Sequence, residues 1–240
     1  MTEKSKRPAQ RATRDGNKRE DLLRIGVAVF TEKGFHNTPV DEIVGAAGVP
    51  KGSFAYYFGS KDAYTVLVIE RYAEYFNKKL DRILSDTTAE PIDRIKAFMD
   101  EATEGMERYA FRRGCLVGNL GQELAALDET FRGVLLAAVR GWQVRVRACL
   151  EEAQQIGQLS AGVDTDGLAR LFWYAWEGAV LGSKLEKSRA PLDAVSEAFI
   201  GQLRALGSPT SPVDDPKPRR QRAAGKDVRG RQRPGPSTNR

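Results

Sequence analysis

Histidine and cysteine are scarce in this chain: among 240 residues there are one histidine and two cysteines. The cysteines, Cys115 and Cys149, are too few for the disulfide framework of a secreted protein. Together with His36 they also lack the spacing of a structural zinc site. A nucleophile–histidine catalytic set would depend on His36 alone, and the sequence around His36 does not resemble a catalytic motif. We therefore expect no metal, no cofactor and no enzymatic activity.

Long hydrophobic runs are missing as well. The N-terminal segment MTEKSKRPAQRATRD has no apolar core, so it is not expected to be a secretory signal. The most apolar stretch, residues 168–182, is interrupted by Arg170 and Glu177 and is too short to span a bilayer. With a hydrophobic content of 41%, the sequence predicts a cytoplasmic globular protein with no membrane partner.

Basic charge is concentrated at the two ends of the chain. Residues 1–19 carry a net charge of +5 and residues 207–240 carry +6, whereas the whole chain carries +6, so the middle is mildly acidic. Basic ends of this kind are typical of arms that contact a polyanion. The alternative is that both ends are solvated tails. The solvated-tail alternative is stronger for residues 207–240, whose content of Pro, Gly, Arg and Ser predicts disorder.

Apolar side chains recur with helical periodicity, and strand-like alternation of useful length does not occur. Leu22, Ile25, Val29 and Phe30 share one face of the first helix, which Gly34 ends as a left-handed cap. We predict an all-α fold with nine helices. They cover approximately residues 22–33, 39–47, 50–58, 61–84, 91–110, 114–127, 129–156, 164–187 and 191–206.

The first three predicted helices form a helix-turn-helix. Thr38 is expected to be the N-cap of the second helix, with Pro39 at the first helical position and Asp41 in the first turn. A turn at residues 47–49 separates this helix from a short one at 51–57. In such a pair the second helix enters the major groove of DNA.

The short helix carries side chains suited to DNA. Lysine can meet a phosphate, glycine lets the backbone approach the duplex, and serine or tyrosine hydroxyls can bond base edges or phosphates. A further lysine opens the next helix beside its N-terminal amides, a common phosphate site. The residues in question are Lys51, Gly52, Ser53, Tyr56, Tyr57 and Lys61. The alternative for the aromatics is a small helical core, which is the expected role of Phe54 and Phe58.

These residues resemble the DNA-binding signature of the TetR repressor family. The resemblance covers about residues 20–65 and includes Gly34-Phe35, Thr38, Asp41-Glu42-Ile43, Ala46-Ala47-Gly48-Val49, Lys51-Gly52-Ser53-Phe54, Tyr56-Tyr57-Phe58 and Ser60-Lys61. It implies a homodimer that binds a palindromic operator in double-stranded DNA and is released by a small-molecule inducer. The implied DNA contacts are Thr38, Lys51, Gly52, Ser53, Tyr56, Tyr57 and Lys61.

Two positions depart from the family pattern. Ala55 stands where members usually have an aromatic residue that touches DNA, which removes one expected contact and bears on operator preference. Pro50 replaces a more usual serine and so removes a capping hydroxyl. Neither change argues against the fold.

Cys115 is the distinctive residue of the C-terminal half. It follows Arg112 and Arg113 and is expected in the first turn of a helix, where the helix dipole and the two cations would favour the thiolate. Helical spacing places Asn119 and Gln122 on the same face. Cys149 lies mid-helix on an apolar stripe and is expected to be a buried core residue.

This half also resembles the TetR-type repressors that respond to electrophiles and unsaturated acids (NemR-like and AcuR-like). The resemblance implies that Cys115 is the reactive sensor and that Lys184 lies near it. Trp173, Glu177, Val180 and Lys184 share a helical face suited to a pocket wall. The expected ligand-sensing residues are therefore Cys115, Asn119, Trp173, Glu177 and Lys184. The alternative for Glu177 and Lys184 is a solvated face.

The last two predicted helices are rich in apolar positions, and the resemblance implies that they pair with those of a second copy. The residues concerned are Leu168, Leu171, Phe172, Ala175, Trp176, Val195, Phe199 and Leu203. We expect a flexible arm (1–19), a DNA-binding domain (20–65), a ligand-binding and dimerisation domain (66–206) and a disordered tail (207–240). Two functional alternatives remain: reversible metabolite sensing in the same fold, and an architectural DNA-binding protein.

Overall fold

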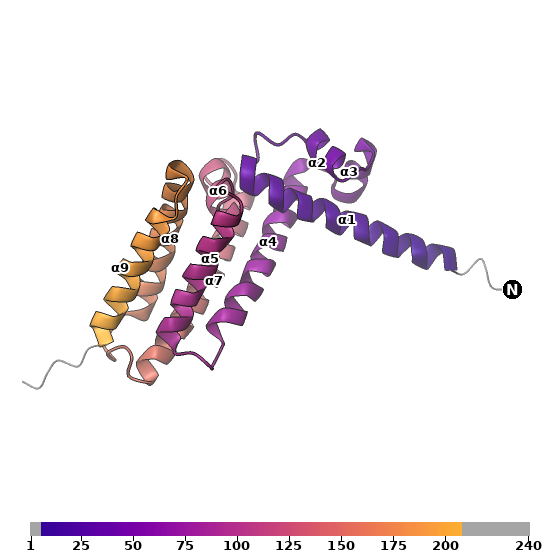
Figure 1. Ribbon diagram of the computed structural model, residues 1–240. Coiled ribbons are helices and arrows are strands. Elements are labelled where there is room, and N and C mark those ends of the chain that lie inside the picture. The colour runs from indigo at the N-terminus through magenta and orange to yellow at the C-terminus, as the bar shows by residue number, and fades with distance from the viewer. Residues whose placement is uncertain (1–5, 208–240) are drawn as a thin grey trace, which may run out of the picture. The chain divides into compact units, whose positions relative to one another are not determined.

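The computed structural model describes the backbone of residues 6–207, and the side chains of that range from Gly16 onward. Within this range the chain is all-helical, as predicted, and has nine helices (Figure 1). They are α1 (Lys6–Lys33), α2 (Val40–Ala46), α3 (Lys51–Phe58), α4 (Lys61–Leu84), α5 (Pro91–Arg108), α6 (Leu116–Leu124), α7 (Glu129–Gln155), α8 (Thr165–Glu186) and α9 (Ala190–Gly207).

The N-terminal boundary differs from the expectation of a flexible arm over residues 1–19. Helix α1 begins at Lys6, so residues 6–19 extend the amphipathic helix that starts at Leu22. This segment contains Ala, Gln, Arg and Lys, which favour helix. The predicted disordered tail lies outside the described residues except for Gly207, which ends α9.

Local signals account for the helix ends around α1 to α4. Gly34 ends α1 with φ 77° and Gly48 follows α2 with φ 61°, both in the left-handed region that suits glycine. Ser60 caps α4, as predicted, because its hydroxyl oxygen accepts a 3.0 Å bond from the N–H of Ala63. The predicted N-cap at Thr38 is wrong, because Pro39 is the N-cap of α2 and makes no side-chain bond there.

The core of the bundle is aromatic. Helix α7 packs against α4 and α8, α9 packs against α8, and α5 packs against α4, α7 and α9 (Figure 1). The Trp142 ring lies 4.6 Å from that of Phe76 and 5.1 Å from that of Trp173, measured between centroids. Phe98 of α5 lies 5.7 Å from Trp173. Rings of this size bury large apolar areas and hold four helices to one centre.

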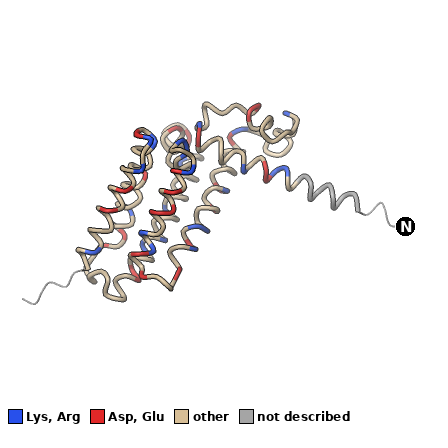
Figure 2. Tube along the Cα trace, in the orientation of Figure 1, with Lys and Arg blue, Asp and Glu red and all other residues tan. Residues whose placement is uncertain are grey.

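Charge is distributed along the helices of the bundle without segregation by sign (Figure 2). Many of these side chains pair between helices: Arg145 of α7 lies 2.6 Å from Asp81 of α4, and Arg94 of α5 lies 2.8 Å from Glu152 of α7. In residues 6–207, no helix has both the length and the apolar character needed to cross a bilayer.

Candidate functional site

Helix α3 is anchored by two phenylalanines. Phe54 and Phe58 are buried, and their ring centroids lie 4.9 and 4.8 Å from that of Tyr64 on α4. Tyr64 in turn donates a 2.7 Å hydrogen bond to the carbonyl of Leu22 on α1. The core role predicted for the two phenylalanines is confirmed. Anchoring of this face leaves the other face of α3 free to contact a partner.

That outer face carries most of the predicted DNA contacts. Tyr56 is 77% exposed, Lys51 and Gly52 are also exposed, and Ser53 and Tyr57 are half-buried. The Lys51 amine lies 2.7 Å from the Asp41 carboxylate, an exposed pair that a phosphate could replace. A methyl group at Gly52 would meet no atom within 4 Å, so the backbone there is open to close approach.

The other two predicted contacts, Thr38 and Lys61, serve the fold. Thr38 is fully buried and its hydroxyl donates a 2.7 Å bond to the carbonyl of Gly34, so that hydroxyl is not available to DNA in this conformation. The Lys61 amine donates a 2.7 Å bond to the carbonyl of Phe35 and lies 4.0 Å from the Phe35 ring centroid. Burial lowers the pKa of Lys61. Both side chains therefore hold the α1–α2 loop.

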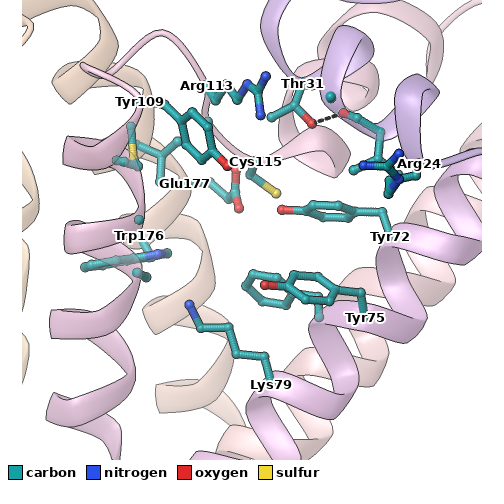
Figure 3. A pocket seen from close by; sticks show the side chains of 18 of the residues that line it. Arg24, Thr31, Tyr72, Tyr75, Lys79, Tyr109, Arg113, Cys115, Trp176 and Glu177 are labelled. Carbon is teal, nitrogen blue, oxygen red and sulfur yellow. Dashed lines mark hydrogen bonds between the residues drawn. The ribbon is translucent and has the colours of Figure 1, made fainter. Parts of the chain in front are cut away.

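A cavity of about 480 Å³ lies within the helical bundle. Its walls come from α1, α4, α5, α8 and the segment before α6, and they combine aromatic rings with cations and one acid (Figure 3). The polar and aromatic lining residues include Arg24, Tyr72, Tyr75, Lys79, Tyr109, Arg113, Cys115, Trp173, Trp176 and Glu177. Such a cavity suits a small ligand with both an apolar and an anionic part.

Cys115 lies in the cavity wall at the N-cap of α6, one position before the predicted first turn. Its sulfur accepts a 3.4 Å hydrogen bond from the N–H of Gly118. The Tyr72 hydroxyl and the Glu177 carboxylate both point toward this sulfur (Figure 3), and both influence the pKa of the thiol. Figure 3 shows the sulfur between these two side chains, which come from α4 and α8. Three separate parts of the chain thus meet at one thiol.

The expectation that this site favours the thiolate is wrong for the described conformation. Burial, and then the negative charge of Glu177, raise the pKa of the Cys115 thiol well above its ordinary value. The nearby arginines act elsewhere, since Arg113 and Arg112 lie 3.3 and 3.9 Å from Glu32 of α1. Lys184 does not line the cavity; its amine donates to Asn119, at 3.2 Å.

Glu177 is the acid that sequence reasoning placed on the pocket wall, and the structure puts it against the sulfur. Its burial raises the pKa of this carboxyl to about 7. One carboxylate oxygen lies so close to Gly118 that a methyl group there would overlap it. Glycine at position 118 therefore lets α6 and α8 approach and brings the acid to Cys115. Trp173 and Val180, predicted on the same face, also line the cavity.

Helix α6 connects the cavity wall to α1 and to the loop that follows α1. We call α1, α2 and α3, the predicted helix-turn-helix, the DNA-reading unit. The Asn119 side-chain amide donates a 2.8 Å bond to the carbonyl of Thr31 in α1. The Glu123 carboxylate accepts bonds from the backbone N–H groups of Phe35 and His36, at 2.6 and 3.1 Å. Cys115, Asn119 and Glu123 follow one another at four-residue steps, so they share a face of α6.

Sequence reasoning missed some of these residues. Glu123 was overlooked in favour of Gln122, which is exposed, although the four-residue spacing from Cys115 and Asn119 could have identified it. Tyr72, Tyr75, Phe76 and Lys79 line the cavity from α4, and their spacing marks a single helical face. Cys149 is buried as expected and donates to the carbonyl of Pro91. The described residues contain no cluster of three or more His, Cys, Asp or Glu able to hold a metal ion.

Of the eight predicted dimer-forming residues, five are buried, Ala175 and Val195 are half-buried, and Leu171 is exposed. Leu168, Phe172, Trp176, Phe199 and Leu203 are buried inside the chain itself, so they are not free to contact a second copy. The exposed apolar side chains of α8 are instead Leu171, Tyr174, Leu181 and Leu185. Small exposed residues run along α9 at helical spacing: Ala194, Ala198, Gly201 and Ala205. Together these residues form an apolar face on α8 and α9.

Comparisons with known proteins agree with this architecture. The sequence model described as "Bacterial regulatory proteins, tetR family" matches residues 22–63, and "Tetracyclin repressor-like, C-terminal domain" matches residues 91–199. The chain is 46% identical to "Transcriptional regulator AcuR" of Cereibacter sphaeroides over 75% of its own length and 82% of that protein. It is 29% identical to "HTH-type transcriptional repressor NemR" of Escherichia coli, over 73% and 88% of the two chains.

A solved structure, "regulatory protein TetR from Rhodobacter sphaeroides", superimposes with a TM-score of 0.73 at 46% identity, covering 76% of this chain and 96% of that one. The two family models together cover the helix-turn-helix and the helices from α5 into α9, and leave out most of α4.

Proposed function

The chain belongs to the TetR family of bacterial regulatory proteins, and from this premise we propose that it represses transcription as a homodimer on a palindromic operator. The outer face of α3, with Lys51 and Tyr56 exposed and Gly52 open to close approach, supports DNA reading by this helix. The apolar face on α8 and α9 supports pairing of two copies. In such a dimer two copies of α3 would lie about one DNA turn, roughly 34 Å, apart.

The proposed inducer is a small electrophile or unsaturated acid that enters the cavity and engages Cys115. This proposal rests on the position of the Cys115 sulfur, which lies in the cavity wall between Tyr72 and Glu177 (Figure 3). Aromatic rings suit an apolar, unsaturated group. Lys79 and Arg113 line the same cavity, and a carboxylate or carbonyl oxygen of the ligand could replace their present partners Glu101 and Glu32. The buried indole N–H of Trp173, another lining residue, has no hydrogen-bond partner among the described residues.

Helix α6 is the proposed route from the cavity to DNA. A ligand at Cys115 would disturb the N-terminus of α6, and Asn119 and Glu123 would carry the movement to α1 and the loop after it. A small rotation of each DNA-reading unit would then spoil the fit to both half-sites at once.

Cys115→Ser tests covalent sensing. The variant should bind operator DNA as tightly as the wild type but fail to release it when an unsaturated electrophile is added. Cys149→Ser is the matched control, because Cys149 is buried away from the cavity and should not alter release. Release of Cys115→Ser at wild-type inducer concentrations would reject covalent sensing and favour reversible binding in the same cavity.

A further inference from the structure

We propose that the Glu177 carboxylate is the base that takes the proton from Cys115 when the thiol adds to an α,β-unsaturated carbonyl compound in the cavity. This inference rests on the proposed sensing function. Glu177 would remove the thiol proton, and the bond from sulfur to the β-carbon defines the ligands as α,β-unsaturated carbonyl compounds.

The cavity supplies no other evident way to ionise the thiol. Burial opposes the thiolate, so the fraction ionised without a base is small at neutral pH. The cations facing the cavity are each held by an acid: Lys79 lies 3.3 Å from Glu101, Arg113 lies 3.3 Å from Glu32, and Arg24 lies 3.3 Å from Asp21. A base in direct contact with the thiol removes this obstacle.

Glu177 satisfies the geometric and chemical conditions for that role. Its carboxylate lies beside the Cys115 sulfur in the cavity wall (Figure 3), so the thiol proton has a short path to a carboxylate oxygen. Its pKa of about 7 keeps a large share ionised at neutral pH and makes it a stronger base than an ordinary carboxylate. The Gly118 N–H donates a hydrogen bond to the sulfur, and the Tyr72 hydroxyl points toward the sulfur from the side opposite Glu177 (Figure 3). Both groups would stabilise the thiolate as it forms.

The step balances without a further reactant. The sulfur forms a bond to the β-carbon of the unsaturated compound while the thiol proton moves to Glu177. The π electrons of the carbon–carbon double bond shift toward the α-carbon and the carbonyl oxygen. The proton on Glu177 then passes to the α-carbon, which restores the carboxylate. The product is a saturated thioether, with S–H added across the former double bond.

The experiment follows alkylation of the full-length protein by acrylamide, measured peptide by peptide with mass spectrometry between pH 5.5 and 8.5. In the wild type, the Cys115 rate should rise up to about pH 7 and then level off, as Glu177 becomes ionised. Glu177→Gln should slow the reaction at pH 7 by roughly 10²-fold and replace the plateau with a rise of about tenfold per pH unit. Glu177→Asp should restore part of the rate. Cys149 serves as an internal reference.

The possible outcomes separate the two proposals. Because the charge of Glu177 also raises the pKa of the thiol, a purely electrostatic role predicts that Glu177→Gln reacts faster than the wild type. That result, or an equal rate, would overturn the assignment of Glu177 as base and leave covalent sensing intact. If Glu177→Gln does not fold, the wild-type profile decides, since an unbroken rise through pH 7 would also reject the base. A wild-type Cys115 that resists acrylamide altogether would overturn both proposals.

Discussion

Glu123, at the C-terminal end of α6, accepts a 2.6 Å hydrogen bond from the backbone N–H of Phe35 in the loop after α1. The same carboxylate accepts the N–H of His36 at 3.1 Å. These two donors follow Gly34, whose left-handed conformation ends α1. Because the N–H groups after this point no longer bond within the helix, they need other acceptors. The Glu123 side chain thus fixes the loop between α1 and α2 within the DNA-reading unit.

Glu123→Ala should therefore destabilise the protein. Two backbone donors would lose a charged acceptor, which predicts a decrease of about 1–3 kcal/mol in the free energy of unfolding, measured with urea. Gln122→Ala is the control, because that exposed neighbour on α6 should change the free energy by less than about 0.5 kcal/mol. Equal midpoints for the two variants would contradict the role given to Glu123.

Alanine at Gly118 should separate Glu177 from Cys115. The added methyl group overlaps the Glu177 carboxylate, so Gly118→Ala is expected to move the carboxyl away from the sulfur and to gain less stability than an alanine that meets no neighbour. In Gly121→Ala on the same helix, the methyl group meets no atom within 4 Å. That control should gain about 0.5–1 kcal/mol from the higher helix propensity of alanine. Calorimetry gives the melting temperature of each variant, and equal changes in the two would contradict the overlap at Gly118.

The pH dependence of stability should report the half-buried Glu177. Folding raises its pKa from 4.5 to about 7, so its contribution to stability is complete below pH 4.5 and is lost as the pH rises through 7. Glu177→Gln cannot titrate. Between pH 5 and pH 8, the wild type should lose about 2 kcal/mol of unfolding free energy relative to this variant. Parallel stability curves would show that the carboxyl has an ordinary pKa.

Lys51→Ala tests the DNA-reading surface. Loss of one phosphate contact should weaken operator binding and lower the slope of log affinity against log salt by about 1. Lys78→Ala is a matched control, because both lysines have side chains that are 72% exposed and both pair with a carboxylate at 2.7 Å. Lys78 lies on α4, outside the reading helix. Identical slopes for the two variants, determined by fluorescence anisotropy, would argue against a phosphate contact at Lys51.

Leu185→Asp tests the apolar face on α8 and α9. Leu185 is 76% exposed in one chain, and a carboxylate there should split a dimer and reduce cooperative operator binding. Leu127→Asp introduces the same charge at a leucine that is 73% exposed but lies in the loop after α6. Light scattering should therefore give a halved mass for the first variant only. A dimer that survives Leu185→Asp would place the interface elsewhere.

The fold was largely predictable because its signals are local. Helix ends follow from Gly34 and Ser60, and helix faces follow from the repeat of apolar residues. The same local pattern identified Phe54 and Phe58 as core. Thr38 shows the limit, since a threonine before proline resembles a cap, yet its hydroxyl bonds back to Gly34.

The chemistry of the cavity was less predictable because it depends on long-range packing. Tyr72 and Glu177 meet at Cys115 only through the association of α4 and α8 around α7. The arginine at position 113 is adjacent to the cysteine in sequence, but its partner is Glu32 on another helix. The arginines next to Cys115 in sequence therefore suggested an ionised sulfur, whereas in the fold the charged group that shifts the pKa of the thiol is the carboxylate of Glu177.

The placement of the tryptophans gives the molecule a built-in optical reporter. The sequence has three tryptophans, and all of them lie in α7 and α8, away from the helices that read DNA. Trp173 and Trp176 line the cavity, and Trp142 packs against Trp173. Intrinsic emission should therefore report what fills the cavity, because two of the three tryptophans line it and none lies on α2 or α3. Occupancy of the cavity can therefore be followed by intrinsic emission without labelling the protein.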